Sequence, residues 1–166
     1  MNGGKPKPRI EPTSASRTSV STPSPKQRAV YRAVIALILH NGSRDFHKLV
    51  PMSAKIIRDE YIDDHHIFPK AFLADLPTPP PTELRDCILN RTLIDQKTNV
   101  RIGARAPSDY LAEMADELGE PSLDRLLKSH LLPVGPESPL RQDQFEDFLA
   151  TRQAAIWKKM QEATAG

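Results

Sequence analysis

Apolar residues recur at the three- and four-residue spacing of an amphipathic helix along most of the chain after residue 26. The first such stretch begins at Gln27 and is expected to end at Asn41-Gly42, a pair that favours a turn. Ser53–Glu60 is expected to form a second, shorter helix. The apolar positions of the first helix are Val30, Val34, Leu37 and Ile38.

The C-terminal half continues this helical pattern. Pro107 is expected to open one helix, Ser122–Ser129 to form the next, and Gln142–Met160 to form the longest of all. Their expected apolar faces are Tyr110, Leu111, Met114 and Leu118, then Leu123, Leu126 and Leu127, and finally Phe145, Phe148, Leu149, Ile156 and Met160.

The middle of the chain differs, with short apolar segments between turns. Residues 61–73 predict a brief strand, a turn and one helical turn, whereas residues 77–82 predict a loop, because consecutive prolines forbid both a helix and a strand ladder. A short helix, a strand around Thr92–Ile94 and a helix from about Asp95 are expected next. The fold class is therefore α+β and mostly α-helical, with a small β element at its centre.

Residues 1–26 form a separate leader with five prolines, eight serines or threonines, five basic residues and one acidic residue. Such a segment has little apolar surface to bury, so we expect it to be disordered, and we expect one domain over residues 27–163. The whole chain has 23 basic and 21 acidic residues, a net charge of +2, so the domain itself is close to neutral. Charge alone therefore does not predict a nucleic-acid partner.

Cys87 is the only cysteine, which excludes an internal disulfide framework and a zinc site built on paired cysteines. This cysteine usage favours a reducing, cytoplasmic location. The longest apolar run, Ala33–Leu39, is far shorter than the roughly 20 residues that a membrane-spanning helix needs. No membrane association is expected.

Two adjacent histidines, His65 and His66, follow two aspartates in the expected strand. Neighbouring strand residues point to opposite faces, so the two imidazoles cannot make the same contact. Imidazole can bind a metal ion or accept a proton at neutral pH, because its ordinary pKa is near 6.5. The pair can thus combine a metal ligand with a general base. The alternative is a pair of hydrogen-bonded histidines at a strand end.

Three separated segments, HHIFPKAFL, ILNRTLIDQKTN and RIGARAPSDYL, occur in an order that resembles the HNH (ββα-metal) endonuclease superfamily. The similarity is to the branch found at the C-terminus of GmrSD-type, modification-dependent restriction endonucleases, and it extends over roughly residues 30–160. It implies a small ββα-metal (HNH) core embedded in a helical domain. It also implies metal-dependent hydrolysis of DNA phosphodiester bonds, in restriction of foreign or modified DNA.

By position, the resemblance makes His66 the general base and Asn90 the residue that ties down the loop and helps to orient this base. It implies that His65 and Asn99 are metal ligands. Asp64 could join the metal shell or orient a histidine, although a solvated aspartate is an equal alternative. The implied cofactor is a divalent ion, Mg²⁺ first, with Mn²⁺ or another divalent ion as alternatives.

Basic residues follow the histidine pair. Between Arg85 and Arg105 there are five basic residues and two acidic ones, an excess typical of either a phosphate-contact patch or a solvated helix face. The candidate DNA-contacting residues are Lys70, Arg91, Arg101 and Arg105. His130, far downstream, is expected to be a packed histidine and no ligand.

The implied partner is DNA, and the resemblance leaves room for a separate nucleotide-hydrolysing subunit or domain that supplies targeting, because the chain has no GxxxxGK[ST] loop of its own. Two other interpretations remain open. One is a non-catalytic nucleic-acid-binding or assembly module that retains the HNH fold, and the other is a structural domain that binds a metal.

Overall fold

The computed structural model describes residues 25–59 and 61–165, so most of the expected leader lies outside the described part of the chain. The described residues form a mixed α+β structure, mostly helical, with one two-stranded antiparallel sheet, as expected from the sequence. The elements are α1 (Pro25–His40), α2 (Ala54–Asp59), β1 (Asp63–His66), α3 (Lys70–Ala74), α4 (Thr82–Arg85), the 3₁₀ helix η1 (Ile88–Asn90), β2 (Arg91–Ile94), α5 (Gln96–Ile102), α6 (Pro107–Leu118), α7 (Glu120–Ser129) and α8 (Phe145–Thr164).

Several boundaries differ from the expected ones, each for a local reason. α1 begins at Pro25, since proline fits the first turn of a helix. The proline loop ends at Pro81, so Thr82 already belongs to α4. α8 starts at Phe145 and not at Gln142. Asp143 has a φ of 55°, in the left-handed region that interrupts a helix, and its carboxylate accepts hydrogen bonds from Ser108 N and Oγ.

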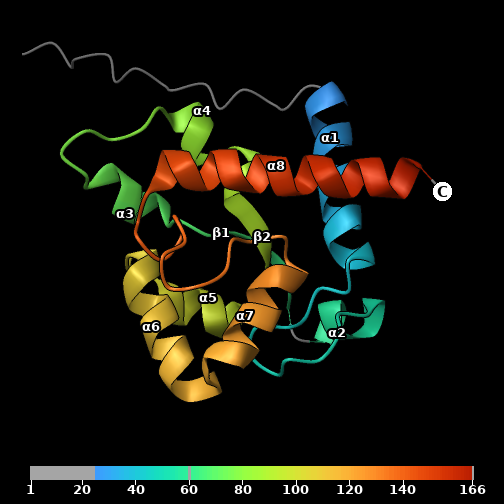
Figure 1. Ribbon diagram of the computed structural model, residues 1–166, viewed down its shortest axis with the longest axis horizontal. Coiled ribbons are helices and arrows are strands. Elements are labelled where there is room, and N and C mark those ends of the chain that lie inside the picture. Colours follow the sequence, from blue (N-terminus) through green and yellow to red (C-terminus); the bar gives the residue numbers. More distant parts are fainter. Residues whose placement is uncertain (1–24, 60, 166) are drawn as a thin grey trace, which may run out of the picture.

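The small sheet lies at the centre, between α8 on one side and α5, α6 and α7 on the other (Figure 1). The main core joins these layers, and the Phe68 ring packs 5.2 Å from the Phe145 ring and 5.0 Å from the Phe148 ring. A second apolar cluster lies where α1 crosses α8 and contains Val34, Leu37, Ile38 and Ile156. None of the helices in the described residues is long and apolar enough to span a membrane.

Two residues expected in apolar faces are exposed instead. Val30 of α1 is 49% exposed and Met160 of α8 is 38% exposed. Val30 precedes Val34 by about one helical turn and Met160 follows Ile156 by about one turn, so both lie outside the cluster in which the two helices pack. Figure 1 shows that each helix extends past the point where the two cross. The apolar stripe is therefore buried over only part of each helix.

The Asn90 side chain fastens the segment that leaves β1. Its Oδ1 accepts a hydrogen bond from Phe68 N at 2.8 Å, while its Nδ2 donates to Phe68 O at 3.0 Å and to Arg85 O at 2.9 Å. Its backbone carbonyl accepts from Ile67 N at 2.9 Å. Asn90 is fully buried, and its amide thereby satisfies three backbone groups of two segments that lie far apart in sequence.

Arg152 of α8 is also fully buried and binds the same region from the other side. Its Nη1 donates to Leu89 O and to Arg91 O, each at 2.7 Å, so its two acceptors flank Asn90 in sequence. Burial lowers the pKa of this guanidinium. A buried cation held by carbonyl oxygens fixes the position of η1 and β2 against α8.

His130 connects the sheet to the segment after α1, and it is packed as expected. Its Nε2 donates to Arg44 O at 2.7 Å, and its Nδ1 accepts from Thr92 Oγ1 at 2.7 Å. Its ring centroid lies 4.8 Å from that of Phe46. Complete burial lowers the pKa of His130 to about 4, so the imidazole is neutral in the folded protein at pH 7.

We predict that Asn90→Ala lowers the free energy of unfolding by about 3 kcal/mol or more, because it leaves buried backbone groups of Phe68 and Arg85 unpaired. Urea denaturation at pH 7 measures this change. The matched control is Asn99→Ala, since the Asn99 side chain makes no hydrogen bond among the described residues. Equal losses for the two variants would contradict the structural role of Asn90.

A second prediction concerns acid stability. His130 takes up a proton near pH 6.5 when unfolded but only near pH 4 when folded, so its contribution is complete above pH 6.5 and is lost as the pH falls toward 4. Between pH 7 and pH 5 the loss amounts to about 2 kcal/mol. His130→Gln should remove this part of the pH dependence, as measured by denaturation at both pH values.

The control for this measurement is His40→Gln, because His40 is exposed at the end of α1. The control should keep the pH dependence of the wild-type chain. A His130→Gln chain that loses as much stability between pH 7 and pH 5 as the control does would refute the prediction.

Candidate functional site

Strand β1 places the two adjacent histidines on opposite faces of the sheet, as expected from strand geometry. In the antiparallel pairing His66 lies opposite Arg91, and His65 lies opposite Thr92. Directly opposed residues share a face, so His66 faces the same side as Arg91, and His65 faces the side of the buried Thr92. The two imidazoles therefore have different surroundings, which are described in turn.

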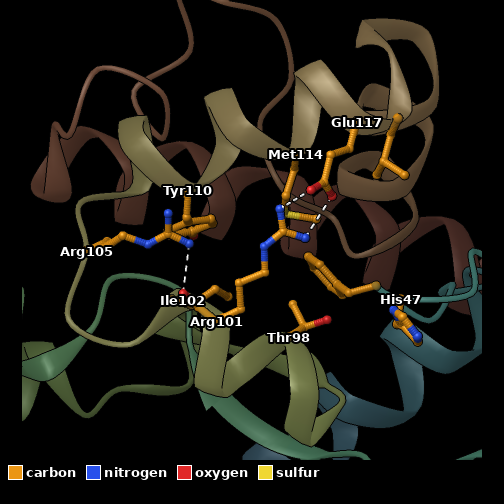
Figure 2. A pocket seen from close by; sticks show the side chains of 10 residues that line it. His47, Thr98, Arg101, Ile102, Arg105, Tyr110, Met114 and Glu117 are labelled. Carbon is orange, nitrogen blue, oxygen red and sulfur yellow. Dashed lines mark hydrogen bonds and ion pairs between the residues drawn. The ribbon is translucent and has the colours of Figure 1, made fainter.

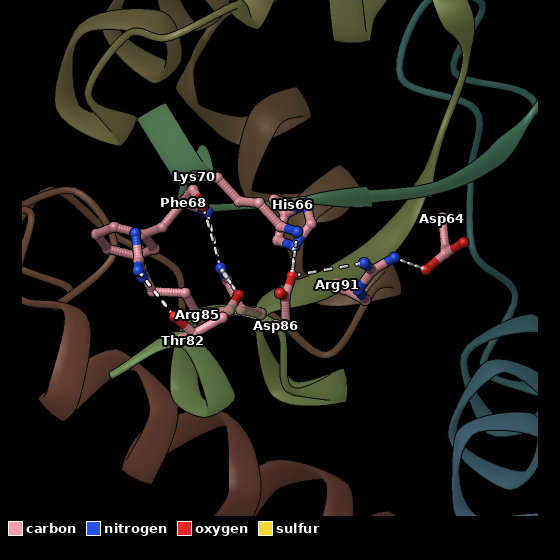
Figure 3. A network of polar contacts seen from close by, with 9 residues as sticks. Asp64, His66, Phe68, Lys70, Thr82, Arg85, Asp86 and Arg91 are labelled. Carbon is pink, nitrogen blue, oxygen red and sulfur yellow. Dashed lines mark hydrogen bonds and ion pairs between the residues drawn. The ribbon is translucent and has the colours of Figure 1, made fainter. Parts of the chain in front are cut away.

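The His66 face carries a network of charged side chains (Figure 3). His66 Nε2 lies 3.0 Å from Asp86 Oδ1, and Lys70 Nζ lies 2.6 Å from the same oxygen. Arg91 Nη2 is 3.8 Å from that oxygen. The imidazole of β1, the ammonium of α3 and the guanidinium of β2 thus all approach the same carboxylate oxygen.

The pKa shifts in this network define its charge state. Burial lowers the pKa of His66 first, the positive charges of Arg91 and Lys70 lower it further, and the hydrogen bond to Asp86 opposes them only in part. Burial alone raises the pKa of the Asp86 carboxyl, but hydrogen bonds from Lys70 and His66 outweigh it and hold that pKa below its ordinary range. Asp86 is therefore ionised and accepts from His66 Nε2–H, so the lone pair of the neutral ring lies on Nδ1.

Asp64, a candidate metal ligand, lies on the His66 face. Its carboxylate binds the guanidinium of Arg91 and accepts a hydrogen bond from the Tyr31 hydroxyl of α1. Burial, followed by this hydrogen bond to Asp64, raises the pKa of Tyr31. In this arrangement Asp64 orients Arg91, and it does not lie on the same strand face as His65.

His65 and Asn99, the other two candidate ligands, are both half-buried. Neither side chain takes part in a hydrogen bond or ion pair within the described residues. Across residues 25–59 and 61–165 there is no group of three or more His, Cys, Asp or Glu side chains that could hold a metal ion. An imidazole nitrogen and an amide oxygen fit a divalent ion that takes its remaining ligands from water or phosphate, because mixed N/O sites of this kind suit several metals.

Asn90 lies beneath the site and not at its surface. It fixes Phe68, two residues after His66, so it sets the backbone on which the base candidate sits. This is the loop-tying role that the resemblance implies.

Arg101 and Arg105 lie apart from the network of His66. Both bind Glu113 of α6, and Arg101 also binds Glu117. They line a pocket between α5 and α6, in which Figure 2 shows the Arg101 guanidinium directed at Glu117. Of the four candidate DNA contacts, the structure brings Lys70 and Arg91 to His66, whereas the charges of Arg101 and Arg105 are balanced within the fold.

Asp86 and Tyr31 are members of this site that the sequence did not indicate. Asp86 lies 20 residues after His66, and Tyr31 is a half-buried residue of α1. Asp86 belongs to no motif or periodic pattern, whereas Tyr31 precedes Val34 and Ile38 at helical spacing. The signal for Asp86 was indirect, since it is one of two acidic residues in the otherwise basic stretch between Arg85 and Arg105.

The chain is 37% identical over 86 residues to the uncharacterized protein MJ0686 of Methanocaldococcus jannaschii, and the match covers 52% of this chain and 14% of the archaeal protein. No protein-family model matches the sequence. No solved structure matches it. The chain is thus similar to a small part of a much longer archaeal protein.

Proposed function

We propose that this chain is a metal-dependent HNH endonuclease that hydrolyses DNA phosphodiester bonds in restriction of foreign or modified DNA. The observation that carries the proposal is the position of His66, at the end of an antiparallel strand pair that leads into α5, with Lys70 and Arg91 around it. An imidazole beside two cations can combine a general base with donors that bind a phosphate. The order β1, β2, α5 is also the one that the resemblance implies.

In this proposal His66 takes the proton from the attacking water. A neutral imidazole with one free nitrogen can do so, and a positioned base of this kind contributes about 10²- to 10⁴-fold to a reaction rate. Lys70 and Arg91 contact the negative charges of the phosphate backbone. Asn90 holds the backbone after His66, so that the ring keeps its position.

His65 and Asn99 would hold the divalent cation. When bound, it would supply Lewis-acid stabilisation of charge on the phosphate oxygens. The donor set of one imidazole and one amide contains no carboxylate, because Asp64 is bound to Arg91. Such a set suits Mn²⁺ at least as well as Mg²⁺, which prefers oxygen ligands.

Targeting would come from elsewhere. The chain matches only 14% of the longer archaeal relative. A small module of this kind is expected to act beside other domains, including the nucleotide-hydrolysing subunit or domain that the resemblance leaves room for. DNA is the proposed partner.

A non-catalytic nucleic-acid-binding or assembly module is the second candidate. Exposed apolar side chains on α1 and α8 favour assembly: Trp157 is 60% exposed, and Val30 and Met160 also face outward. This candidate predicts a folded chain that cuts no DNA with any divalent ion.

We predict that His66→Ala reduces DNA cleavage by at least about 100-fold, because it removes the base. The measurement is nicking of supercoiled plasmid, modified and unmodified, with Mg²⁺, Mn²⁺ or EDTA. His40→Ala is the matched control, since His40 is an exposed histidine of α1 and should leave the rate unchanged. If His66→Ala cuts as fast as the control, His66 is not the base. If the wild-type chain cuts no plasmid at all, the second candidate function is preferred.

Metal binding can be tested without cleavage. We predict that His65→Ala weakens Mn²⁺ binding by at least about tenfold, as measured by calorimetry of the full chain. His47→Ala, which removes an exposed histidine outside the sheet, should bind Mn²⁺ as the wild type does. Unchanged Mn²⁺ affinity in His65→Ala would show that His65 is not a ligand.

A further inference from the structure

The Asp86 carboxylate occupies a position with the character of an anion-binding site. Its Oδ1 lies 3.0 Å from His66 Nε2, 2.6 Å from Lys70 Nζ and 3.8 Å from Arg91 Nη2 (Figure 3). These donors come from three different elements and converge on one oxygen. We propose that they form the binding site for a phosphate group of the DNA backbone, and that Asp86 is an internal competitor which phosphate displaces. This inference rests on the proposed function.

The donors match a phosphate oxygen as well as they match a carboxylate oxygen. Ammonium and guanidinium groups form charge-assisted hydrogen bonds with both anions, and phosphate offers more oxygens to share among three donors. The site is open to solvent, because the Lys70 side chain is 52% exposed and the Asp86 side chain 35% exposed. A phosphate of a DNA strand can therefore reach the donors from outside.

Two of the three donors, Arg91 and His66, have supports other than Asp86. Arg91 is bound through its Nη1 by Asp64, which in turn accepts from the Tyr31 hydroxyl. Arg91 and His66 are opposed residues of the paired strands, so their backbone positions are fixed by the sheet ladder. The guanidinium and the imidazole would keep their arrangement when the carboxylate leaves.

Asp86 belongs to the lightly packed side of the site. It follows α4, which contains no buried residue and comes after the proline loop that ends at Pro81. Within residues 25–59 and 61–165, the polar partners of the Asp86 side chain are Lys70, Arg91 and His66. Rotation of the Asp86 side chain would move its carboxylate away from the three donors, and the buried residues of the core would not have to move.

Displacement has a consequence for His66. While Asp86 is in place, it accepts the Nε2–H of the ring. A phosphate that takes the place of the carboxylate accepts this Nε2–H instead, so the ring keeps the tautomer whose lone pair lies on Nδ1. Asp86 would then keep the site closed to weakly bound anions until a DNA strand supplies several phosphate contacts at once.

The test is calorimetric titration of the full chain with inorganic phosphate, in EDTA and at low ionic strength. Asp86→Asn is expected to bind phosphate about tenfold more tightly than the wild type, because an uncharged amide no longer competes for the cations. Asp86→Ala, which also removes the carboxylate, should show the same gain. Circular dichroism establishes that each variant is folded.

Two controls assign the effect to this site. Asp75→Asn removes one negative charge from the exposed end of α3 and should leave phosphate affinity within about twofold of the wild type. Adding Lys70→Gln to Asp86→Asn should cancel the gain. Asp86 variants that bind phosphate no better than Asp75→Asn, or a gain that survives the loss of Lys70, would overturn the inference.

The readout separates this inference from the proposed nuclease activity. A gain in phosphate affinity without plasmid cleavage by any chain would support the anion site and count against the nuclease. Cleavage by the wild type, with no gain in the Asp86 variants, would support the nuclease and refute the competitor role of Asp86.

Discussion

The buried amide of Asn90 is the constraint on which the rest of the structure depends. Two four-residue strands form too small a sheet to be stable alone, and the chain between them must cross a proline loop and return. Asn90 closes this excursion by binding both backbone groups of Phe68 and the carbonyl of Arg85. The closure sets the Phe68 ring in the core and the half-buried His66 two residues before it, so the core and the candidate site depend on one hydrogen-bonding residue.

Two further buried polar side chains attach this small sheet to the helices. Arg152 binds the carbonyls on either side of Asn90 from α8, and His130 joins Thr92 of β2 to the segment after α1. Each lies far from its partners in sequence and is fully buried. A helical body thus positions a sheet of two strands through side-chain-to-backbone hydrogen bonds, and the positions of the site residues follow from those bonds.

The sequence predicted the elements better than it predicted the site. Helical periodicity located the long helices, and short apolar segments between turns located the two strands, because both patterns depend on local geometry. The helix ends were less predictable, since the left-handed backbone of Asp143 depends on a contact with Ser108, 35 residues away. Asp86 and Tyr31 reach the site through chain crossings of the same kind, which leave no periodic signal in the sequence. His65, His66, Asn90 and Asn99 come from the resemblance by motif position alone, and their roles stay predictions.

The ion pairs of the structure divide the basic residues of the chain into two groups with different surroundings. Counting along the sequence gave a basic stretch between Arg85 and Arg105, but the fold divides it. Arg101 of α5 and Arg105 of the segment after it are both paired with acids of α6. Arg91 is held between Asp64 and Asp86, beside Lys70. In this chain, whose net charge is +2, the concentrated cationic site is thus balanced by the carboxylates of Asp64 and Asp86. A site balanced in this way binds isolated anions weakly, because each must compete with an internal carboxylate for the same donors.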